Sequence, residues 1–378
     1  MGALYRWLVR PWLRVQDSER AHRRALLGLR AMGAVAPARW VLRGLYGRRS
    51  SASVTFCGTT YDHPFGLAAG MDKNAEALRG WPALGLSFVE IGGVTQHEQQ
   101  GNPKPRMFRA SHAQALVNRM GFNNQGSEKI AARLKSHWEQ HGPLPIPLWI
   151  NLGKSKITPL EVAEQDYAAT MRALWPYATV FVVNVSSPNT PNLRELQNDD
   201  GLIRILKACM DVNNTLAKQH GASTKPILVK VAPDLTDEQL IHVVDTARNN
   251  GADGMVLANT SLARPVNQHP SDQTVFDEQG GMSGQPVKQR ATDMIRLVHR
   301  HTGGTWPLVG VGGVSSADDA WAKIRAGASL VQAYSGFVFE GPSLAKTIAK
   351  GLDRRMHKAG FSTLEAVVGS EHRGDEVA

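Results

Sequence analysis

The stretch Val180-Phe181-Val182-Val183-Asn184-Val185-Ser186-Ser187-Pro188-Asn189-Thr190 joins an apolar run to a polar loop. Residues 180–185 are almost all β-branched or aromatic, which predicts a strand covered on both faces in a parallel sheet, and Pro188 ends its hydrogen-bond ladder. The loop combines amides and hydroxyl groups without a carboxylate, so it suits a planar polar ligand better than a metal ion or a cation. An ordinary Asx or Ser-Pro turn that closes a βα unit is the alternative.

Seven similar apolar runs occur along the chain, and amphipathic segments separate them. With the first run they make eight predicted strands: 65–69, 88–91, 147–151, 180–185, 227–231, 254–258, 308–311 and 330–333. Predicted helices cover 160–174, 202–220, 237–250, 287–301, 317–326 and 344–357. Eight βα units with right-handed crossovers predict an α/β fold, a (β/α)8 TIM barrel whose active site lies at the carboxyl ends of the strands. An open, doubly wound sheet is the alternative fold.

The domain organisation is predicted from the chain length and from the distribution of apolar segments along it. A chain of 378 residues with 42% apolar content accommodates one barrel-sized domain and an appendage. We expect a helical extension over 1–46, the barrel over 47–361 and a disordered tail over 362–378. Cys57 and Cys209 are far apart and in no ligand-like spacing, so we expect neither a disulfide framework nor a zinc site, and a reducing cytoplasm fits.

The net charge of +10 is concentrated at the N-terminus. Residues 1–49 contain eleven Arg against Asp17 and Glu19, a net +9, whereas the remainder carries 32 basic and 31 acidic residues. A neutral body with one basic arm argues against a nucleic-acid binder and favours an arm that contacts an anionic lipid surface. No run approaches ~18 uncharged apolar residues, so we expect no transmembrane helix, and the frequent Arg residues argue against a secretory signal.

The arm itself has a helical pattern. Leu4, Leu8, Trp12 and Val15 share one side of a helical wheel, opposite Arg6, Arg10 and Arg14, and Pro11 interrupts a straight helix. Asp17 is a candidate N-cap for a second apolar stripe, Ala21, Ala25, Leu29 and Met32, which Gly33 and Pro37 would end before a third helical piece over 38–46. The pattern favours an amphipathic hairpin on a membrane surface; a helical cap packed on its own domain is the alternative.

Two lysines stand out at the predicted strand ends. Lys230 lies within an apolar strand, where an unpaired ammonium is costly, so it requires a negative partner in the barrel mouth. A carboxylate such as Asp72 is one candidate partner. Lys73 follows the first strand and also requires a negative partner, which a substrate carboxylate would provide. Glycine-rich turns after the last two strands, 310–313 and 333–336, predict a phosphate site.

Eleven short motifs together resemble a known enzyme family. They are AAGMDKN (68–74), EIGGVT (90–95), GNPKPRMFR (101–109), NRMGFNN (118–124), NLGK (151–154), NVSSPNT (184–190), VKVAPDL (229–235), ANTS (258–261), GGMSGQP (280–286), GVGG (310–313) and AYSG (333–336). In this order they resemble dihydroorotate dehydrogenase, the flavin enzyme of pyrimidine synthesis, across nearly the whole chain. The serine at position 187 and the basic arm resemble the membrane-associated, quinone-dependent class (class 2), since the cytosolic class has cysteine there and lacks the arm.

The resemblance implies an activity and a location. It implies oxidation of (S)-dihydroorotate to orotate in de novo UMP synthesis, with Ser187 as the base for the C5 proton and hydride transfer from C6 to N5 of FMN. Thr190 and an ordered water are candidates to pass the proton on. Lys230 would face negative charge on the reduced flavin. A peripheral membrane protein on the cytoplasmic face of the inner membrane, which reduces a membrane quinone, is expected.

The resemblance also assigns site residues. FMN is expected against Ala69, Gly70, Met71, Asp72, Lys73, Gly93, Asn151, Asn184, Lys230, Ala258, Gly284, Gly313, Tyr334 and Ser335. The pyrimidine is expected against Lys73, Asn118, Arg119, Met120, Gly121, Phe122, Asn184, Asn189, Asn259 and Thr260, and the quinone between His22 and Arg109. The chain departs from the family at Gly93 and Ala258, where a hydroxyl residue is usual, so a side-chain hydrogen bond is lost at each.

Two functions of other classes compete with this interpretation. A barrel lyase or isomerase would use the phosphate site for its substrate. A non-catalytic, membrane-binding barrel would show no flavin reduction by dihydroorotate.

Overall fold

Eight parallel strands form a closed barrel in the computed structural model, which describes residues 5–47, 50–190, 192–197, 199–266 and 269–374. Around the barrel the strands are β3 (Phe65–Leu67), β4 (Val89–Val94), β7 (Leu148–Leu152), β8 (Val180–Asn184), β9 (Ile227–Lys230), β10 (Gly254–Leu257), β12 (Leu308–Gly310) and β13 (Leu330–Ala333), which pairs with β3. These are the eight predicted strands. The (β/α)8 prediction is confirmed, and closure excludes the open sheet.

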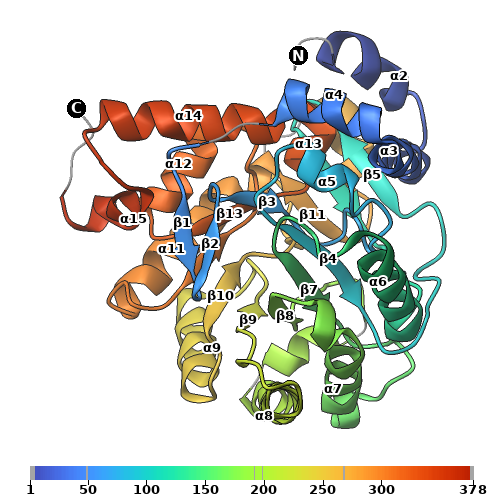
Figure 1. Cartoon of the computed structure of the whole chain (residues 1–378). Coiled ribbons are helices and arrows are strands. Elements are labelled where there is room, and N and C mark those ends of the chain that lie inside the picture. Colours follow the sequence, from blue (N-terminus) through green and yellow to red (C-terminus); the bar gives the residue numbers. More distant parts are fainter. Residues whose placement is uncertain (1–4, 48–49, 191, 198, 267–268, 375–378) are drawn as a thin grey trace.

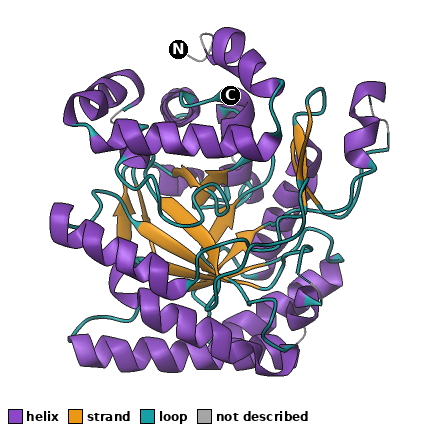
Figure 2. Ribbon diagram, turned by 90° about the vertical axis from the view of Figure 1, so that its right-hand side faces the viewer, coloured by secondary structure: helices purple, strands orange, loops and turns teal. Residues whose placement is uncertain are grey.

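Helices surround the barrel on its outer side (Figures 1 and 2). They are α6 (Ser127–His141), α7 (Ala163–Leu174), α8 (Asp199–His220), α9 (Asp237–Asn249), α11 (Lys288–His301), α12 (Ala317–Arg325), α13 (Ser335–Glu340) and α14 (Leu344–Lys358). Short helical pieces are α5 (Gly80–Ala83), α10 (Gln273–Phe276) and the 3-10 turns Leu160–Val162, Trp175–Tyr177, Leu193–Gln197, Pro270–Asp272 and Gln285–Val287. Every residue of β7, β8, β9 and β10 is buried, because helices cover one face of each strand and the barrel interior covers the other.

Strand register determines which polar residues meet at the barrel mouth. Asn184, the last residue of β8, is aligned with Lys230, the last residue of β9. Asn151 of β7 is aligned with Gly92 of β4. Because parallel strands present their carboxyl ends at one edge, these side chains are placed together by the register.

Aromatic side chains close the opposite end of the barrel. The hairpin of β1 (Val54–Phe56) and β2 (Thr59–Tyr61) brings Phe56 and Tyr61 against Phe88 and Trp149, with ring centroids 4.6–6.3 Å apart. The indole N–H of Trp149 donates to the Tyr61 hydroxyl over 3.0 Å, so the polar atoms in this buried cluster are satisfied. The mouth is therefore the end of the barrel left for a ligand.

A second sheet, which the sequence pattern did not predict, lies outside the barrel. It consists of β5 (Met107–Ala110), β6 (Ala115–Asn118) and β11 (Gly281–Gly284), all antiparallel, with Gly281 aligned with Asn118. Two segments far apart in sequence, 118–124 and 280–286, are thereby held over the barrel mouth.

The N-terminal arm is helical, as predicted. It contains a π-helical turn (Tyr5–Val9), α2 (Arg10–Arg14), α3 (Ser18–Ala34) and α4 (Ala36–Tyr46), whereas Leu4 lies outside the described residues. Asp17 caps α3 by accepting from the Arg20 N–H over 2.9 Å, and Pro11 occupies the first turn of α2, where the missing N–H matters least. Gly33 does not end α3; it lies within the helix, where a Cβ would come within 2.7 Å of the Gly80 nitrogen.

Among the described helices, none is by itself long and apolar enough to cross a membrane. The pair α3 and α4 reaches the necessary length and composition only when combined, and the two helices are bent by 111°.

The C-terminal segment differs from the expected disordered tail. Residues 364–372 form α15 (Leu364–Val367) and a 3-10 turn (Ser370–His372), and Leu364 and Val367 are fully buried. Arg296 of α11 pairs with Glu371 over 2.5 Å. The tail is packed on the barrel through residue 374 because a few apolar residues within its polar sequence are buried against the barrel helices. Residues 375–378 lie outside the described residues.

Candidate active site

The barrel mouth contains a pocket, here called the mouth pocket, which brings together most of the predicted site residues. Those that line it are Ala69, Gly70, Lys73, Gly93, Asn118, Met120, Gly121, Phe122, Asn184, Ser187, Asn189, Lys230, Ala258, Asn259, Thr260, Gly284, Gly313, Tyr334 and Ser335. They come from the ends of most barrel strands and from the second sheet. Such convergence of distant loops is the usual construction of a TIM-barrel active site.

Four of the residues predicted to contact FMN or the pyrimidine do not line the mouth pocket. Asp72 is buried and accepts from the backbone N–H groups of Glu76 and Ala77 and from the Trp81 indole, over 2.7–2.9 Å. Met71 faces a different cavity. Arg119 pairs with a carboxylate over 2.6 Å on the outer surface. Asn151 is fully buried behind the pocket.

Amide side chains form a continuous network at the strand ends. The Asn184 side-chain amide donates to the Asn151 side-chain oxygen over 2.9 Å, and the Asn184 side-chain oxygen accepts from the Ser186 hydroxyl over 2.9 Å and from the Asn259 amide over 3.2 Å. Asn259 also donates to the Ser186 hydroxyl over 2.9 Å. Each amide is thus oriented by its neighbours, which presents fixed donors and acceptors to a ligand.

Lys230 has a buried carboxylate partner that the sequence interpretation missed. Its Nζ lies 3.8 Å from Glu90 Oε1, and Glu90 is fully buried in β4. Glu90 also accepts from the Asn151 amide over 2.6 Å and from the Gln332 amide over 2.5 Å. Asp72, the suggested partner, is occupied elsewhere. A carboxylate within the otherwise apolar run 88–94 was the signal that could have identified Glu90.

Ser187 lies on the loop after β8 and is 7% exposed. Its hydroxyl accepts from the Asn189 N–H over 3.3 Å. The same loop contacts two covering segments, 118–124 and 101–109. The Asn189 amide donates to the Asn118 side-chain oxygen over 3.2 Å, and the Asn102 amide donates to the Asn189 backbone carbonyl over 3.2 Å. Ser187 therefore sits in a largely enclosed position under two covering loops.

Lys73 approaches the pocket from the first strand end. Its ammonium donates to the Asn123 side-chain oxygen in the covering segment. Removal from water, followed by the nearby positive charge of Arg106, lowers the pKa of Lys73 to about 7. A lysine poised in this way gains charge when an anion binds beside it.

A second cavity of about 790 Å³, here called the arm cavity, lies between the arm and the barrel. His22 and Arg109, the predicted quinone-site pair, both line it. The His22 ring is stacked on Tyr334 with centroids 6.4 Å apart, and burial, reinforced by the charge of Lys73, lowers the pKa of His22 to about 4. Arg109 donates to the Leu13 carbonyl over 3.4 Å. Tyr334 and Met107 line both cavities, so their side chains form part of the wall between them.

The sequence matches a known enzyme family over most of its length. The dihydroorotate dehydrogenase family matches residues 51–356. The chain belongs to the dihydroorotate dehydrogenase family. It is 43% identical to the dihydroorotate dehydrogenase (quinone) of Mycobacterium tuberculosis over 97% of this chain and 98% of that protein, and 48% identical to the enzyme of the same name from Anaeromyxobacter dehalogenans over 85% of each.

Solved dihydroorotate dehydrogenase structures share the fold. That of Eimeria tenella in complex with ferulenol superposes with a TM-score of 0.84 at 32% identity, covering 94% of this chain and 96% of that one. The ligand-free form from the same organism gives 0.83 at 34% identity, covering 94% of this chain and 100% of that one.

The mouth pocket fits the flavin that this dihydroorotate dehydrogenase family uses. Amide groups and Lys230 suit the alternating polar edge of a flavin ring. At the other end, Gly312 and Gly313 have φ of +100° and +72°, and successive backbone amides in such turns form a concavity for anions. A cation, fixed amides and an anion-binding turn therefore share one pocket.

The two departures from the dihydroorotate dehydrogenase pattern have different surroundings. A Cβ at Gly93 would lie 2.7 Å from the Phe122 ring, so the covering segment occupies the space that a side chain would need. Ala258 is buried and its N–H donates to the Val311 carbonyl over 3.3 Å.

Proposed function

We propose that this chain oxidises (S)-dihydroorotate to orotate in de novo UMP synthesis and passes the electrons through FMN to a membrane quinone. The observation that carries the proposal is the pair of adjoining cavities. The more polar one lies at the barrel mouth and is lined by Ser187 among others; the more apolar one lies under the arm, and Tyr334 and Met107 line both. This arrangement suits two substrates of opposite polarity that exchange electrons without meeting.

FMN is assigned to the strand ends. Ala69, Gly70, Asn184, Lys230, Gly284, Gly313, Tyr334 and Ser335 would contact it, with Asn151 orienting Asn184 from behind. When bound, FMN supplies the acceptor for the hydride that leaves C6 of dihydroorotate. Lys230 provides positive charge where the pocket must tolerate a reduced, anionic ring.

Ser187 is assigned as the base for the C5 proton. A serine hydroxyl is a poor base, so it depends on exclusion of water and on a group that passes the proton on. The low exposure of Ser187 supports the first condition, and Thr190, on the same loop and 6% exposed, is the candidate for the second.

Lys73 and the amides are assigned to hold the pyrimidine. Lys73 would face the substrate carboxylate, while Asn118, Asn189, Asn259 and Thr260 would hydrogen-bond the ring, with Met120, Gly121 and Phe122 above it. Holding both hydrogens towards their acceptors is the positioning part of catalysis.

The arm is assigned to the membrane and the quinone. Trp12 and Val41 line the arm cavity yet are 58% and 60% exposed, so they mark its mouth. A basic arm with exposed tryptophans suits anionic headgroups and the acyl boundary, which supports a peripheral location on the cytoplasmic face of the inner membrane. The quinone ring would lie between His22 and Arg109.

The test is anaerobic reduction of the purified protein's flavin by dihydroorotate, followed by absorbance. Flavin absorbance should fall in the native protein. Ser187→Ala should retain FMN but slow this reduction by about 10²–10⁴, the usual contribution of a general base. Unchanged reduction in the variant would remove Ser187 from the role, and no reduction in the native protein would contradict the proposed activity.

A further inference from the structure

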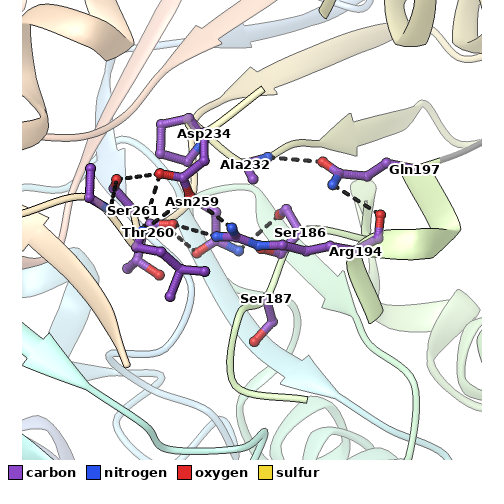
Figure 3. Close-up of polar contacts among 12 residues, drawn as sticks. Ser186, Ser187, Arg194, Gln197, Ala232, Asp234, Asn259, Thr260 and Ser261 are labelled. Carbon is purple, nitrogen blue, oxygen red and sulfur yellow. Dashed lines mark hydrogen bonds and ion pairs between the residues drawn. The ribbon is translucent and has the colours of Figure 1, made fainter. Parts of the chain in front are cut away.

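Arg194 connects three loops behind the proposed base. It belongs to the 3-10 turn Leu193–Gln197, which follows the Ser187 loop in the chain. Its Nε donates to the Ser186 carbonyl over 3.2 Å, its Nη2 donates to the Thr260 carbonyl over 3.1 Å, and its Nη1 lies 2.8 Å from Asp234 Oδ2. One planar guanidinium thus joins the loops after β8, β9 and β10 (Figure 3).

The partners of Arg194 are themselves fixed. Asp234 accepts from the Ser261 hydroxyl and from the Leu262 N–H, so its carboxylate is held by the loop after β10. Gln197 donates to the Arg194 carbonyl over 3.2 Å and accepts from the Ala232 N–H over 3.1 Å, which attaches the same turn to the loop after β9. The 3-10 turn is therefore attached to the neighbouring loops through the side chains of both Arg194 and Gln197.

We propose that Arg194 is a positioning residue that sets the place of the Ser187 hydroxyl by closing the loop that carries it. Ser186 precedes Ser187 directly, and Arg194, which lies further along the chain, bonds the Ser186 carbonyl, so one side chain fixes the backbone immediately before Ser187. In Figure 3 the Ser187 side chain points away from Arg194, so the guanidinium acts through the backbone and not on the hydroxyl.

The choice of arginine is physically specific. Its fork has five N–H donors in fixed directions, which lets it satisfy two carbonyls and a carboxylate at once, whereas an ammonium is a point charge. The side chains of Arg194 and Asp234 are only 22% and 24% exposed, so the contacts are partly shielded from water. Because Thr260 is one of the proposed pyrimidine contacts, the same side chain fixes the base and part of the substrate wall relative to each other.

The inference rests on the proposed role of Ser187, and its test separates the two. Arg194→Ala should slow flavin reduction by dihydroorotate by about 10²-fold, the loss that a misplacement near 1 Å produces. The deuterium isotope effect at C5 should rise, because proton removal becomes slower relative to the other steps. Orotate affinity should change much less, since Arg194 bonds only the backbone carbonyl of Thr260 and every side chain proposed to contact the pyrimidine is retained.

Three further measurements sharpen the test. Guanidinium ion, compared with sodium chloride at equal ionic strength, should restore part of the rate to Arg194→Ala. Arg194→Lys, which keeps one charge but not the fork, should lie between the native protein and the alanine variant. Amide hydrogen exchange in 186–197 should be faster in Arg194→Ala, a readout that does not depend on turnover.

Arg290→Gln is the matched control. Arg290 of α11 holds the loop after β9 through the carbonyls of Pro233 and Leu235 and a 2.7 Å pair with Asp237, and none of these contacts involves the Ser187 loop. This variant should keep the native C5 isotope effect. If Arg194→Ala loses rate with an unchanged C5 isotope effect, or loses orotate affinity in equal proportion, Arg194 has no positioning role. A fast Ser187→Ala variant would instead refute the proposed base.

Discussion

Lys230 is a buried cation in the barrel interior, and a buried carboxylate compensates its charge. It is 5% exposed, and Glu90, at 0%, meets it inside the barrel over 3.8 Å. Glu90 also accepts hydrogen bonds from two side-chain amides, so both of its carboxylate oxygens have partners. Breaking one partner of such a pair leaves the other uncompensated, which is where most of the cost arises.

Lys230→Ala is expected to have two separable effects. Loss of the partner of Glu90 should lower the free energy of unfolding by about 3 kcal/mol. Loss of positive charge beside the flavin should lower its reduction potential or weaken FMN retention. Denaturant unfolding and a redox titration measure these separately.

The double variant Lys230→Met with Glu90→Gln is the control. Replacing both charges should recover most of the stability while the potential stays low. A potential that returns to the native value in the double variant would mean that Lys230 has only a structural role.

Lys73 gives the site a pH dependence. Its protonated form would hold the substrate carboxylate, and its pKa is lowered to about 7, so the charge is present below that pH and is lost as the pH rises through it. Orotate affinity should therefore weaken above about pH 7, by up to about tenfold per pH unit. Binding titrations at a series of pH values should show this slope, and Lys73→Gln should bind weakly and without it. Equal native affinity on both sides of pH 7 would contradict the assignment.

At the scale of elements, helix α3 is attached to the 101–109 segment through Glu19, which pairs with Arg106 and, over 3.6 Å, with Lys104. Glu19 accepts two hydrogen bonds from the Arg106 guanidinium, over 2.7 and 3.0 Å. Arg106 also donates to the Gln100 and Asn102 carbonyls, and Asn102 contacts the Ser187 loop through Asn189. Burial alone would raise the pKa of Glu19, but the bonds from Arg106 outweigh it and hold the pKa below its usual value. The pair therefore stabilises the docked arm at neutral pH and loses that effect only as the pH falls through the lowered pKa.

Glu19→Gln should loosen the arm, because Arg106 would keep its buried charge without the carboxylate. We expect a loss of about 1–3 kcal/mol in unfolding free energy and faster proteolysis of the arm. Glu98→Gln removes the carboxylate of an exposed pair with Lys129 and should change neither quantity measurably. Equal behaviour of the two variants would show that the pair between Glu19 and Arg106 does not help to hold the arm.

At the scale of the whole molecule, most of the exposed large apolar side chains among the described residues belong to the arm. Trp7 and Trp40 are 79% and 78% exposed and do not line the arm cavity. The arm helices gather beside α13 and α14 at one side of the barrel (Figure 1). Exposed tryptophans beside arginines are suited to an interface with anionic lipid.

Replacing Trp7 and Trp40 by Ser should weaken binding to anionic vesicles by at least about tenfold, since each large apolar side chain contributes about 1.5–3 kcal/mol when buried. Flavin reduction by dihydroorotate should stay at the native rate. Ile157→Ser, which removes a side chain 74% exposed on the barrel, is the control and should bind vesicles normally. Unaltered vesicle binding by the tryptophan variant would leave the arm without a membrane role. Substitution is sharper than truncation, because truncation would also remove the partner of Arg106.

The sequence alone determined the barrel and the contents of its mouth. Eight apolar runs of strand length, separated by amphipathic segments, allow few arrangements, and in a parallel barrel every strand delivers its following loop to the same end. The residues at those ends, such as Asn184, Ser187 and Asn259, could therefore be grouped before their positions were known. The helical arm was equally readable, because its capping and periodicity are local.

Only the tertiary structure decided the partners. Lys230 with Glu90, Glu19 with Arg106 and Arg194 with Asp234 each join different elements, and many carboxylates in the chain could have served each cation equally well on charge alone. The sheet of β5, β6 and β11 and the packing of the tail through Leu364 and Val367 depend in the same way on contacts between distant segments. The local sequence pattern indicates which face of a helix or strand is apolar. It does not indicate which polar group of another element that face will contact, because strand register and packing are set by the folded barrel.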